Sequence, residues 1–547
     1  MSASRDGFAA SASPDPRRWV GLVFISLAVA LIIVDSTIVN VAIPSVVDEL
    51  DISSTQVQWV QESYTLVFAS LLLVFGTLAD RFGRRRMLLI GVALFAASSV
   101  AAALAPNGEL LIAARVVQGF GGAMILPATL SLLNATFFGR ERGIAFAVWG
   151  STIGGMAAVG PLLGGWLTTD FSWRWAFGIN LPLGILIVVG ALLVVRESRA
   201  DVPRRVDLVG AALSVLLFTS LVFALIEGRS YGWWSSEAGT PDFWTLEVSP
   251  IPFAFGLAAL ALVAFVAWGV HRERRGLPTM IAFPLFRLAS FRNGNIAALI
   301  VSLGEFGIIL SLPLWLQNVL GYDALQTGFL LLALAGGSFV ASGFAGATSG
   351  RVPPVWVVRA GILAEIVGLV VIALVIAVDT PWWQTAIGLL VYGFGVGLAT
   401  AQLTGVVLAE VPVAQSGQAS GTQSTSRQVG SALGIAILGT VLFTSLASQL
   451  DDRLPSELPS AVRQQVIDAV VDSAGSAIPG LEARSPEAAE AARAAFSEAT
   501  RASAFTAAGF LGVGLLATLS LGSGRRPEET DADAVPASPP QPDGTER

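Results

Sequence analysis

The sequence predicts an all-α membrane protein with fourteen transmembrane helices. Of its 547 residues, 54% are hydrophobic and only 13% are charged, whereas soluble domains carry roughly 25% charged residues. Apolar stretches of about 20 residues, long enough to cross a hydrocarbon core of roughly 30 Å, recur along almost the whole chain. Because backbone groups in lipid must be hydrogen-bonded within the chain, we expect these stretches to be helices.

An even number of spans places both termini on one side of the membrane. Most arginines fall in the segments that then lie inside, so the positive-inside rule predicts a multi-pass protein of a bacterial plasma membrane with both termini in the cytoplasm. The expected order is a cytoplasmic tail (1–18), a six-helix bundle (19–200), two inserted helices (201–275), a second six-helix bundle (276–524) and a disordered tail (525–547). Within the second bundle, residues 447–500 are expected outside the membrane, as a lid over the outer vestibule or as a solvated loop.

The composition excludes several kinds of chemistry. The sequence holds no lysine, which excludes a P-loop and a Schiff base, and no cysteine, which excludes disulfides and thiolate metal sites. Its single histidine, His271, stands beside an arginine at a helix end. We therefore expect no enzyme activity, no cofactor and no metal, and carboxylates must carry any proton that the protein moves.

The two six-helix halves contain an internal repeat. A constant shift of 270 residues places Asp35 on Glu305, Gly76 on Gly346 and Gly91 on Gly361. Repeated halves around a central site are a feature of secondary transporters. The repeat also pairs the two acids that lie deepest in their predicted spans.

Four acids within the spans are weighed as candidates for proton binding. Asp35 and Glu305 lie well inside their spans, where an ionised carboxylate is costly unless it faces protein or water. Burial favours the neutral form, so such groups can bind and release protons as solvent access changes. For Asp35 the alternative is a structural pairing role. Glu62 either lines the cavity or reaches the membrane interface, and Glu365 is more weakly placed in the eleventh span.

The segment that joins the second and third predicted spans is a candidate gate. The segment GTLADRFGRRR runs from Gly76 to Arg86. Gly76 and Gly83 permit close helix approach and a tight turn. Asp80 can accept hydrogen bonds from helix N-terminal amides or pair with an arginine. The alternative for the basic residues, which include Arg81 and Arg84, is that they only anchor the topology.

Small residues line the fifth span. Gly150, Gly154, Gly160 and Gly164 form two small-xxx-small pairs, and Pro161 removes one helical hydrogen bond. This spacing predicts close packing against neighbouring helices.

The gate segment resembles the loop signature of the major facilitator superfamily. Three further segments are similar to motifs of its fourteen-span drug:proton antiporter family. They are VDSTIVNVAIP from Val34, ARVVQGFGGA from Ala114, and VGPLLGGWL from Val159 followed by WRWAFGINLP from Trp173. The second half departs from the loop signature, because GATSGRVPP, from Gly346, lacks the acid.

The resemblance implies roles for individual residues. Arg115 would steady or discharge a nearby protonated acid, the alternative being an extended side chain at the outer interface. The fifth-span motif would seal the bundle against ion leak. In this sequence that motif comprises Gly154, Gly160, Pro161, Gly164 and Gly165.

Together these patterns predict a monomeric, proton-coupled exporter of drugs or other small amphiphilic molecules that works by alternating access. Its partners would be the substrate, protons and the lipid bilayer, and no nucleic acid. A substrate-specific metabolite exporter or an uptake permease of the same fold is one alternative. A membrane sensor or scaffold that transports nothing is another.

Overall fold

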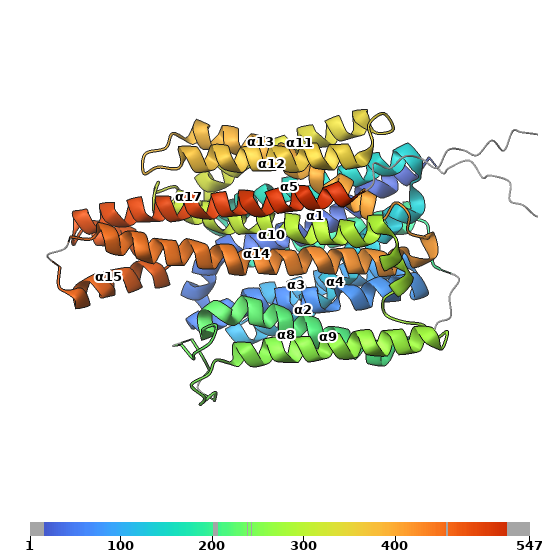
Figure 1. The fold of residues 1–547 in the computed structure, drawn as a ribbon, viewed down its shortest axis with the longest axis horizontal. Coiled ribbons are helices and arrows are strands. Elements are labelled where there is room, and N and C mark those ends of the chain that lie inside the picture. The colour runs from blue at the N-terminus through green and yellow to red at the C-terminus, as the bar shows by residue number, and fades with distance from the viewer. Residues whose placement is uncertain (1–15, 201–205, 238, 242, 456–457, 522–547) are drawn as a thin grey trace, which may run out of the picture.

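The chain folds almost entirely into helices. The computed structural model describes residues 16–200, 206–237, 239–241, 243–455 and 458–521. This part of the chain contains 14 helices long and apolar enough to cross a membrane, which confirms the predicted number and the all-α class. The helices lie side by side along one direction (Figure 1). The predicted tails fall mostly outside the described residues.

The first bundle is built from seven helical segments that form six spans. Its helices are α1 (Arg18–Leu50), α2 (Ser54–Phe82), α3 (Arg84–Ala103), α4 (Gly108–Thr136), α5 (Gly139–Asp170), α6 (Arg174–Gly178) and α7 (Asn180–Val194). The side chain of Ser53 caps α2 and that of Asn107 caps α4, each by accepting a hydrogen bond from a backbone amide of the first turn. The last span is broken into α6 and α7 at Ile179.

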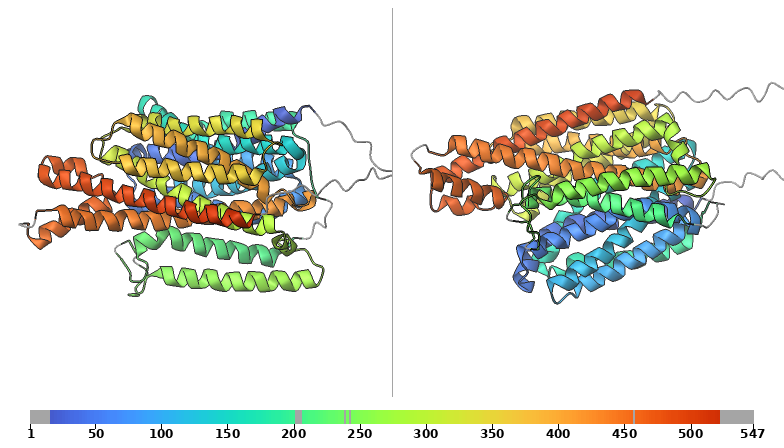
Figure 2. Two further views of the ribbon diagram at one scale, coloured as in Figure 1. Left: turned by 45° about the horizontal axis from the view of Figure 1, so that its top comes forward. Right: turned by 60° about the horizontal axis from the view of Figure 1, so that its bottom comes forward.

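Two inserted helices lie at one edge of the molecule. They are α8 (Leu208–Tyr231) and α9 (Pro250–Arg274), which pack against each other. α8 also packs against α2, and the left view of Figure 2 shows the pair at the lower edge of the molecule. α8 also contacts the second bundle, where the guanidinium of Arg229 lies 3.3 Å from the ring centre of Phe443, so the inserted pair borders both bundles.

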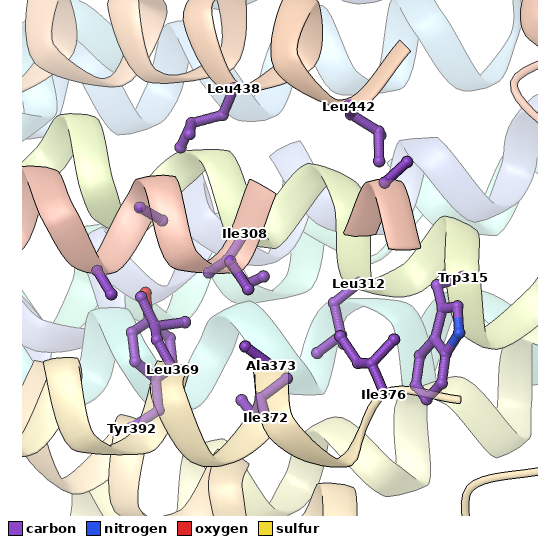
Figure 3. Close-up of a cluster of buried hydrophobic side chains, with 14 of the residues drawn as sticks. Ile308, Leu312, Trp315, Leu369, Ile372, Ala373, Ile376, Tyr392, Leu438 and Leu442 are labelled. Atoms are coloured by element: carbon purple, nitrogen blue, oxygen red, sulfur yellow. The ribbon is translucent and has the colours of Figure 1, made fainter. Parts of the chain in front are cut away.

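The second bundle contains the remaining helices. They are α10 (Ala289–Asn318), α11 (Ala324–Thr348), α12 (Pro354–Val375), α13 (Trp382–Val407), α14 (Ser416–Arg453), α15 (Ser460–Asp472), α16 (Ile478–Glu482) and α17 (Pro486–Ala517). In its core, Ile308 and Leu312 of α10 lie between Ile372 of α12 and Leu438 of α14 (Figure 3). Dense apolar packing of this kind lets the bundle act as one unit.

Helix boundaries reproduce the repeat. α11 begins at Ala324 and α2 at Ser54, which gives 324 − 54 = 270. α12 begins at Pro354 and α3 at Arg84, which gives 354 − 84 = 270. The shift found in the sequence therefore relates matching helices of the two halves.

The segment 447–500 is largely helical. α14 continues to Arg453 and α17 begins at Pro486, so much of this segment extends the two flanking helices. These extensions project past the other helices, with α15 alongside (Figure 1). The alanine-rich stretch after Pro486 is polar yet strongly favours helix, so α17 begins well before its apolar span.

Candidate functional site

A cavity lies between the two bundles. The space in it, including the part that is open to solvent, is about 1000 Å³, and it is lined by α1 and α5 of the first bundle and by α10 to α14 of the second. Most lining side chains are apolar. The polar ones are Ser36, Thr37, Glu305, Tyr392, Thr400 and Arg427. A large apolar cavity with a few polar groups is typical of a site for small organic molecules.

Glu305 places an acid on the cavity wall. One of its carboxyl oxygens, Oε1, accepts a hydrogen bond from Thr400 Oγ1 at 3.0 Å. The other, Oε2, accepts one from Arg427 Nη2 at 3.2 Å. The ion pair joins α10 to α14 at the boundary between protein and cavity, where a ligand or water can reach it.

Asp35 lies behind the cavity wall instead of on it. Its side chain is fully buried, and its Oδ2 accepts a hydrogen bond from Arg115 Nη1 at 2.7 Å. Its Oδ1 accepts hydrogen bonds from Gln118 and Asn180, each at 2.7 Å. The neighbouring Ser36 lines the cavity, so Asp35 faces the interior of the first bundle.

Arg115 is buried too, which excludes the extended position at the interface. Its Nε donates a hydrogen bond to the backbone oxygen of Val60 at 3.1 Å, and its guanidinium lies 4.2 Å from the ring centre of Tyr64. Asp35 and Arg115 thus form one ion pair whose remaining hydrogen-bonding groups are largely satisfied.

Glu62 lies outside the cavity, between the first bundle and the inserted helices. Glu62 and Glu227 of α8 line the same small pocket between α2 and α8. Gln58 donates hydrogen bonds to Glu227 Oε2 at 3.3 Å and to Ser230 Oγ at 2.8 Å. Of the four residues expected in a coupling cavity, only Glu305 therefore lines it in this structure, and Glu62 instead lies where α8 packs on α2.

Asp80 joins the two bundles at one end of the molecule, here named the latch end. Its Oδ1 accepts a hydrogen bond from the amide of Gly417 at 2.7 Å, and its Oδ2 accepts one from the amide of Gln418 at 2.9 Å. These amides belong to the first turn of α14, where the helix dipole favours a negative charge. Arg84 also pairs with Asp80 at 2.7 Å and donates a hydrogen bond to the backbone oxygen of Val413.

The other residues of the predicted gate surround this contact. Gly83 ends α2 with φ +113°, a conformation that side-chain-bearing residues rarely adopt. Arg81 is buried, and its charge lies near Asp80 and Asp207. Gly76 packs so closely on α14 that an added Cβ would lie 2.5 Å from the backbone oxygen of Gly417. All five predicted gate residues therefore lie together at the latch end.

Further contacts close the latch end. Asn134 of α4 donates a hydrogen bond to Ser416 Oγ at 2.8 Å, and Arg142 donates to the backbone oxygen of Ala409 at 3.4 Å. Ser349, in the second-half segment without an acid, donates to the backbone oxygen of Arg140 at 2.9 Å. The two halves thus close this end with different groups.

The glycines of the fifth span pack on both bundles. Added Cβ atoms on Gly160 and Gly164 would meet α1, at 3.1 Å from the backbone oxygen of Val34 and of Ile38 respectively. Gly154 faces α11, where its added Cβ would lie 2.5 Å from Ser338 Oγ, and it also lines the cavity. Pro161 lies inside the helix and Gly165 lies beside Leu325.

Close packing at the latch gives a testable difference between the two halves. Gly76→Ala is expected to reduce strongly the transport that the sequence predicts, because the added methyl group would lie against the backbone of α14 where the two bundles meet. Gly346→Ala, at the equivalent position of the repeat, has open space around the added Cβ and should leave transport unchanged. Transport rates at matched membrane expression would measure both variants, and equal rates for the two would contradict this role of Gly76.

The sequence matches the model of one protein family. The model described as Major Facilitator Superfamily matches residues 25–435. The chain belongs to the Major Facilitator Superfamily. It is 35% identical over 437 residues to a probable actinorhodin transporter of Streptomyces coelicolor, covering 78% of this chain and 72% of that protein.

Other relatives within the Major Facilitator Superfamily are resistance and efflux proteins. The chain is 36% identical to a puromycin resistance protein of Streptomyces alboniger, covering 77% of this chain and 81% of that protein. It is 32% identical to the multidrug efflux pump LfrA of Mycolicibacterium smegmatis, covering 79% of this chain and 82% of that protein. The human organic anion transporter MFSD10 shares the fold, with a TM-score of 0.60 at 13% identity over 92% of this chain and 99% of that one.

Several site residues do not stand out in the sequence. Arg427 lies near the start of a span, where an arginine reads as a topological anchor, yet it reaches the cavity. Gln118 and Asn180 belong to segments singled out for other residues. Glu227 sits at the end of α8 and acquires its role only through contact with α2.

Proposed function

We propose that this protein exports small amphiphilic molecules, such as antibiotics, in exchange for protons. The position of Glu305 carries the proposal: it is an acid with an arginine partner on the wall of a large, mostly apolar cavity between two bundles. Relatives described as puromycin resistance and multidrug efflux proteins support the substrate class. Apolar walls suit lipophilic ring systems, and the ion pair offers polar contacts of both signs.

The cycle would alternate the access of this cavity. In the state described here, the Asp80 contacts join the bundles at the latch end, which we assign to the cytoplasm together with both termini. Protonation of Glu305 would weaken its bond to Arg427 and change the contacts available to a substrate. Release of that proton at the cytoplasmic side would then supply roughly 2.3 kcal/mol per 100 mV of membrane potential.

Asp35 fits a different role from that of Glu305. Because it is charge-balanced by Arg115 and shielded from the cavity, we assign it to orienting α1 against α4 and α7 during the movement. Thr37 and Ser36, on the same helix, face the cavity and would transmit that orientation to the substrate. We further propose that the transporter works as a monomer in a bacterial plasma membrane.

Efflux from intact cells tests this function. Cells that produce the protein and lack their own efflux pumps are expected to accumulate several-fold less puromycin or tetraphenylphosphonium than cells with an empty vector. A protonophore should abolish the difference. Greater accumulation in the producing cells would indicate an uptake permease, and no difference for any member of a chemically diverse toxin panel would favour a sensor or scaffold.

A further inference from the structure

The connector between the inserted helices and the second bundle lies across the latch end. It leaves α9 after Arg274 and reaches α10 at Ala289, and it includes the short helix η1 (Phe283–Arg287). Residues 277–285 of this connector, here named the strap, contact both bundles beside Asp80. The cycle described above gives no role to the strap or to the inserted pair.

The strap is fixed to α2 and to the inserted pair at Met280. Thr77 Oγ1 of α2 donates a hydrogen bond to the backbone oxygen of Met280 at 2.9 Å, and both residues are buried. The side chain of Met280 belongs to an apolar cluster with Leu73 of α2 and Phe265 of α9. α8 also lies against it, because a Cβ atom added to Gly210 would lie 3.0 Å from Met280 Cγ. Met280 therefore anchors the strap on the side of the first bundle.

One residue of α14 joins the strap to the latch. The side-chain nitrogen Nε2 of Gln418 donates a hydrogen bond to the backbone oxygen of Thr279 at 3.0 Å. The backbone amide of the same Gln418 donates to Asp80 Oδ2 at 2.9 Å. Because Thr279 and Met280 are neighbours, adjacent carbonyl groups of the strap are bonded to α14 and to α2. A movement that separates the two bundles at this end must therefore break one of these two bonds.

The latch-end termini of α8 and α9 position the start of the strap. Arg272 Nε of α9 donates a hydrogen bond to the backbone oxygen of Pro278 at 2.8 Å, and it lies 3.5 Å from Asp207 Oδ1. The same oxygen of Asp207 accepts hydrogen bonds from the amide of Gly210, in the first turn of α8, at 3.0 Å and from Trp268 Nε1 of α9 at 2.9 Å. Through these contacts the inserted pair holds the strap where it meets α2.

The rest of the strap packs into the apolar core of the latch end. Ala282 and Leu285 are buried in a cluster that also includes Ala79 of α2 and Ala419 of α14. Each of these two helix alanines directly neighbours a residue of the latch contact. Because the cluster contains residues of both bundles, opening the latch end would expose apolar surface of the strap to water, which is unfavourable.

We propose that the strap is a second fastener of the latch end, through which the inserted helices stabilise the state in which that end is closed. Met280 keeps the strap on the first bundle throughout the cycle, and the bond between Gln418 and Thr279 forms when the end closes and breaks when it opens. The two attachments are unequal, because Met280 is 1% exposed whereas Gln418 holds the strap by one hydrogen bond from a half-buried side chain. The proposal rests on the alternating access inferred above and is independent of the substrate and of proton coupling.

Distances between pairs of spin labels test the strap in the purified full chain, which contains no cysteine of its own. Phe82→Cys on α2, Leu277→Cys on the strap and Ala414→Cys just before α14 place labels at exposed positions of the latch end. Between the two states, the distances from Ala414 to Phe82 and to Leu277 should lengthen together, whereas the distance from Phe82 to Leu277 should stay constant. If the distance from Phe82 to Leu277 changes with the state, the strap leaves the first bundle and the anchor at Met280 is contradicted.

Two substitutions release the strap from opposite sides. Gln418→Ala removes the side chain that binds the strap and keeps the amide that binds Asp80. It should raise the ratio of open to closed latch ends about fivefold, the effect expected from losing one ordinary hydrogen bond. Met280→Ala should raise the ratio as well, and Gln418→Ala should then have little further effect, because a strap freed from α2 no longer joins the bundles. Independent, additive effects of the two substitutions would contradict a connection through the strap.

Two further variants serve as controls. Gln449→Ala makes the same substitution at the other end of α14, where the side chain accepts a hydrogen bond from Arg453, and it should leave the ratio unchanged. Asp80→Asn weakens the latch itself and should raise the ratio. If Gln418→Ala behaves like Gln449→Ala while Asp80→Asn raises the ratio, the bundles alternate without help from the strap and only the strap is contradicted. A constant distance from Phe82 to Ala414 in every variant would contradict alternating access and the strap together.

Discussion

Replacing Arg115 by leucine is expected to abolish transport and to lower the free energy of unfolding by about 3–5 kcal/mol, because it leaves the carboxylate of Asp35 buried without a counter-ion. The expected loss is large because both partners are almost fully buried, and Arg115 also bonds Gln118 and the backbone of Val60. Thermal unfolding of the purified variant and its transport rate would measure the two effects.

The paired variant separates charge balance from packing. Asp35→Asn combined with Arg115→Gln removes both charges and keeps polar side chains at both positions, so it should recover most of the stability lost in the single Arg115→Leu variant. Wild-type stability of Arg115→Leu would show that Asp35 is already neutral or solvated, which would contradict the balanced pair.

Glu305→Gln is expected to abolish proton-driven accumulation while leaving energy-independent substrate exchange within about twofold of wild type. Glutamine retains an oxygen that can accept hydrogen bonds from Thr400 and Arg427, so binding should survive while proton release is lost. Everted membrane vesicles loaded by a pH gradient would measure accumulation, and counterflow of puromycin in the same vesicles would measure exchange.

A matched control for this variant is Glu498→Gln, which changes an acid far from the cavity and should accumulate substrate normally. If Glu305→Gln loses exchange and accumulation equally, the residue serves binding or folding instead of coupling.

Much of the architecture could be predicted from the sequence, because lipid imposes a simple rule of length and hydropathy on each span. That Asp80 has a specific partner was also predictable, because an acid among anchoring arginines is costly unless it is paired, and the amides of Gly417 and Gln418 donate hydrogen bonds to it. The identity of those partners depends on how the two halves pack, which no local pattern records.

The direction in which each acid points, toward the cavity or toward the interior of its bundle, was harder to predict. Asp35 and Glu305 occupy equivalent positions of the repeat, yet one faces the bundle interior and the other faces the cavity. The difference arises from their arginines, since Arg115 comes from α4 behind Asp35 whereas Arg427 comes from α14 at the cavity. Hydropathy gives the depth of a residue but not its direction around the helix.

Substrate-dependent proton movement in reconstituted liposomes is the most direct measurement of coupling at Glu305. With a pH-sensitive dye enclosed and puromycin or tetraphenylphosphonium supplied on one side, the wild-type protein should move protons opposite to the substrate, and Glu305→Gln should move none. Equal proton movement by the two proteins would contradict the account.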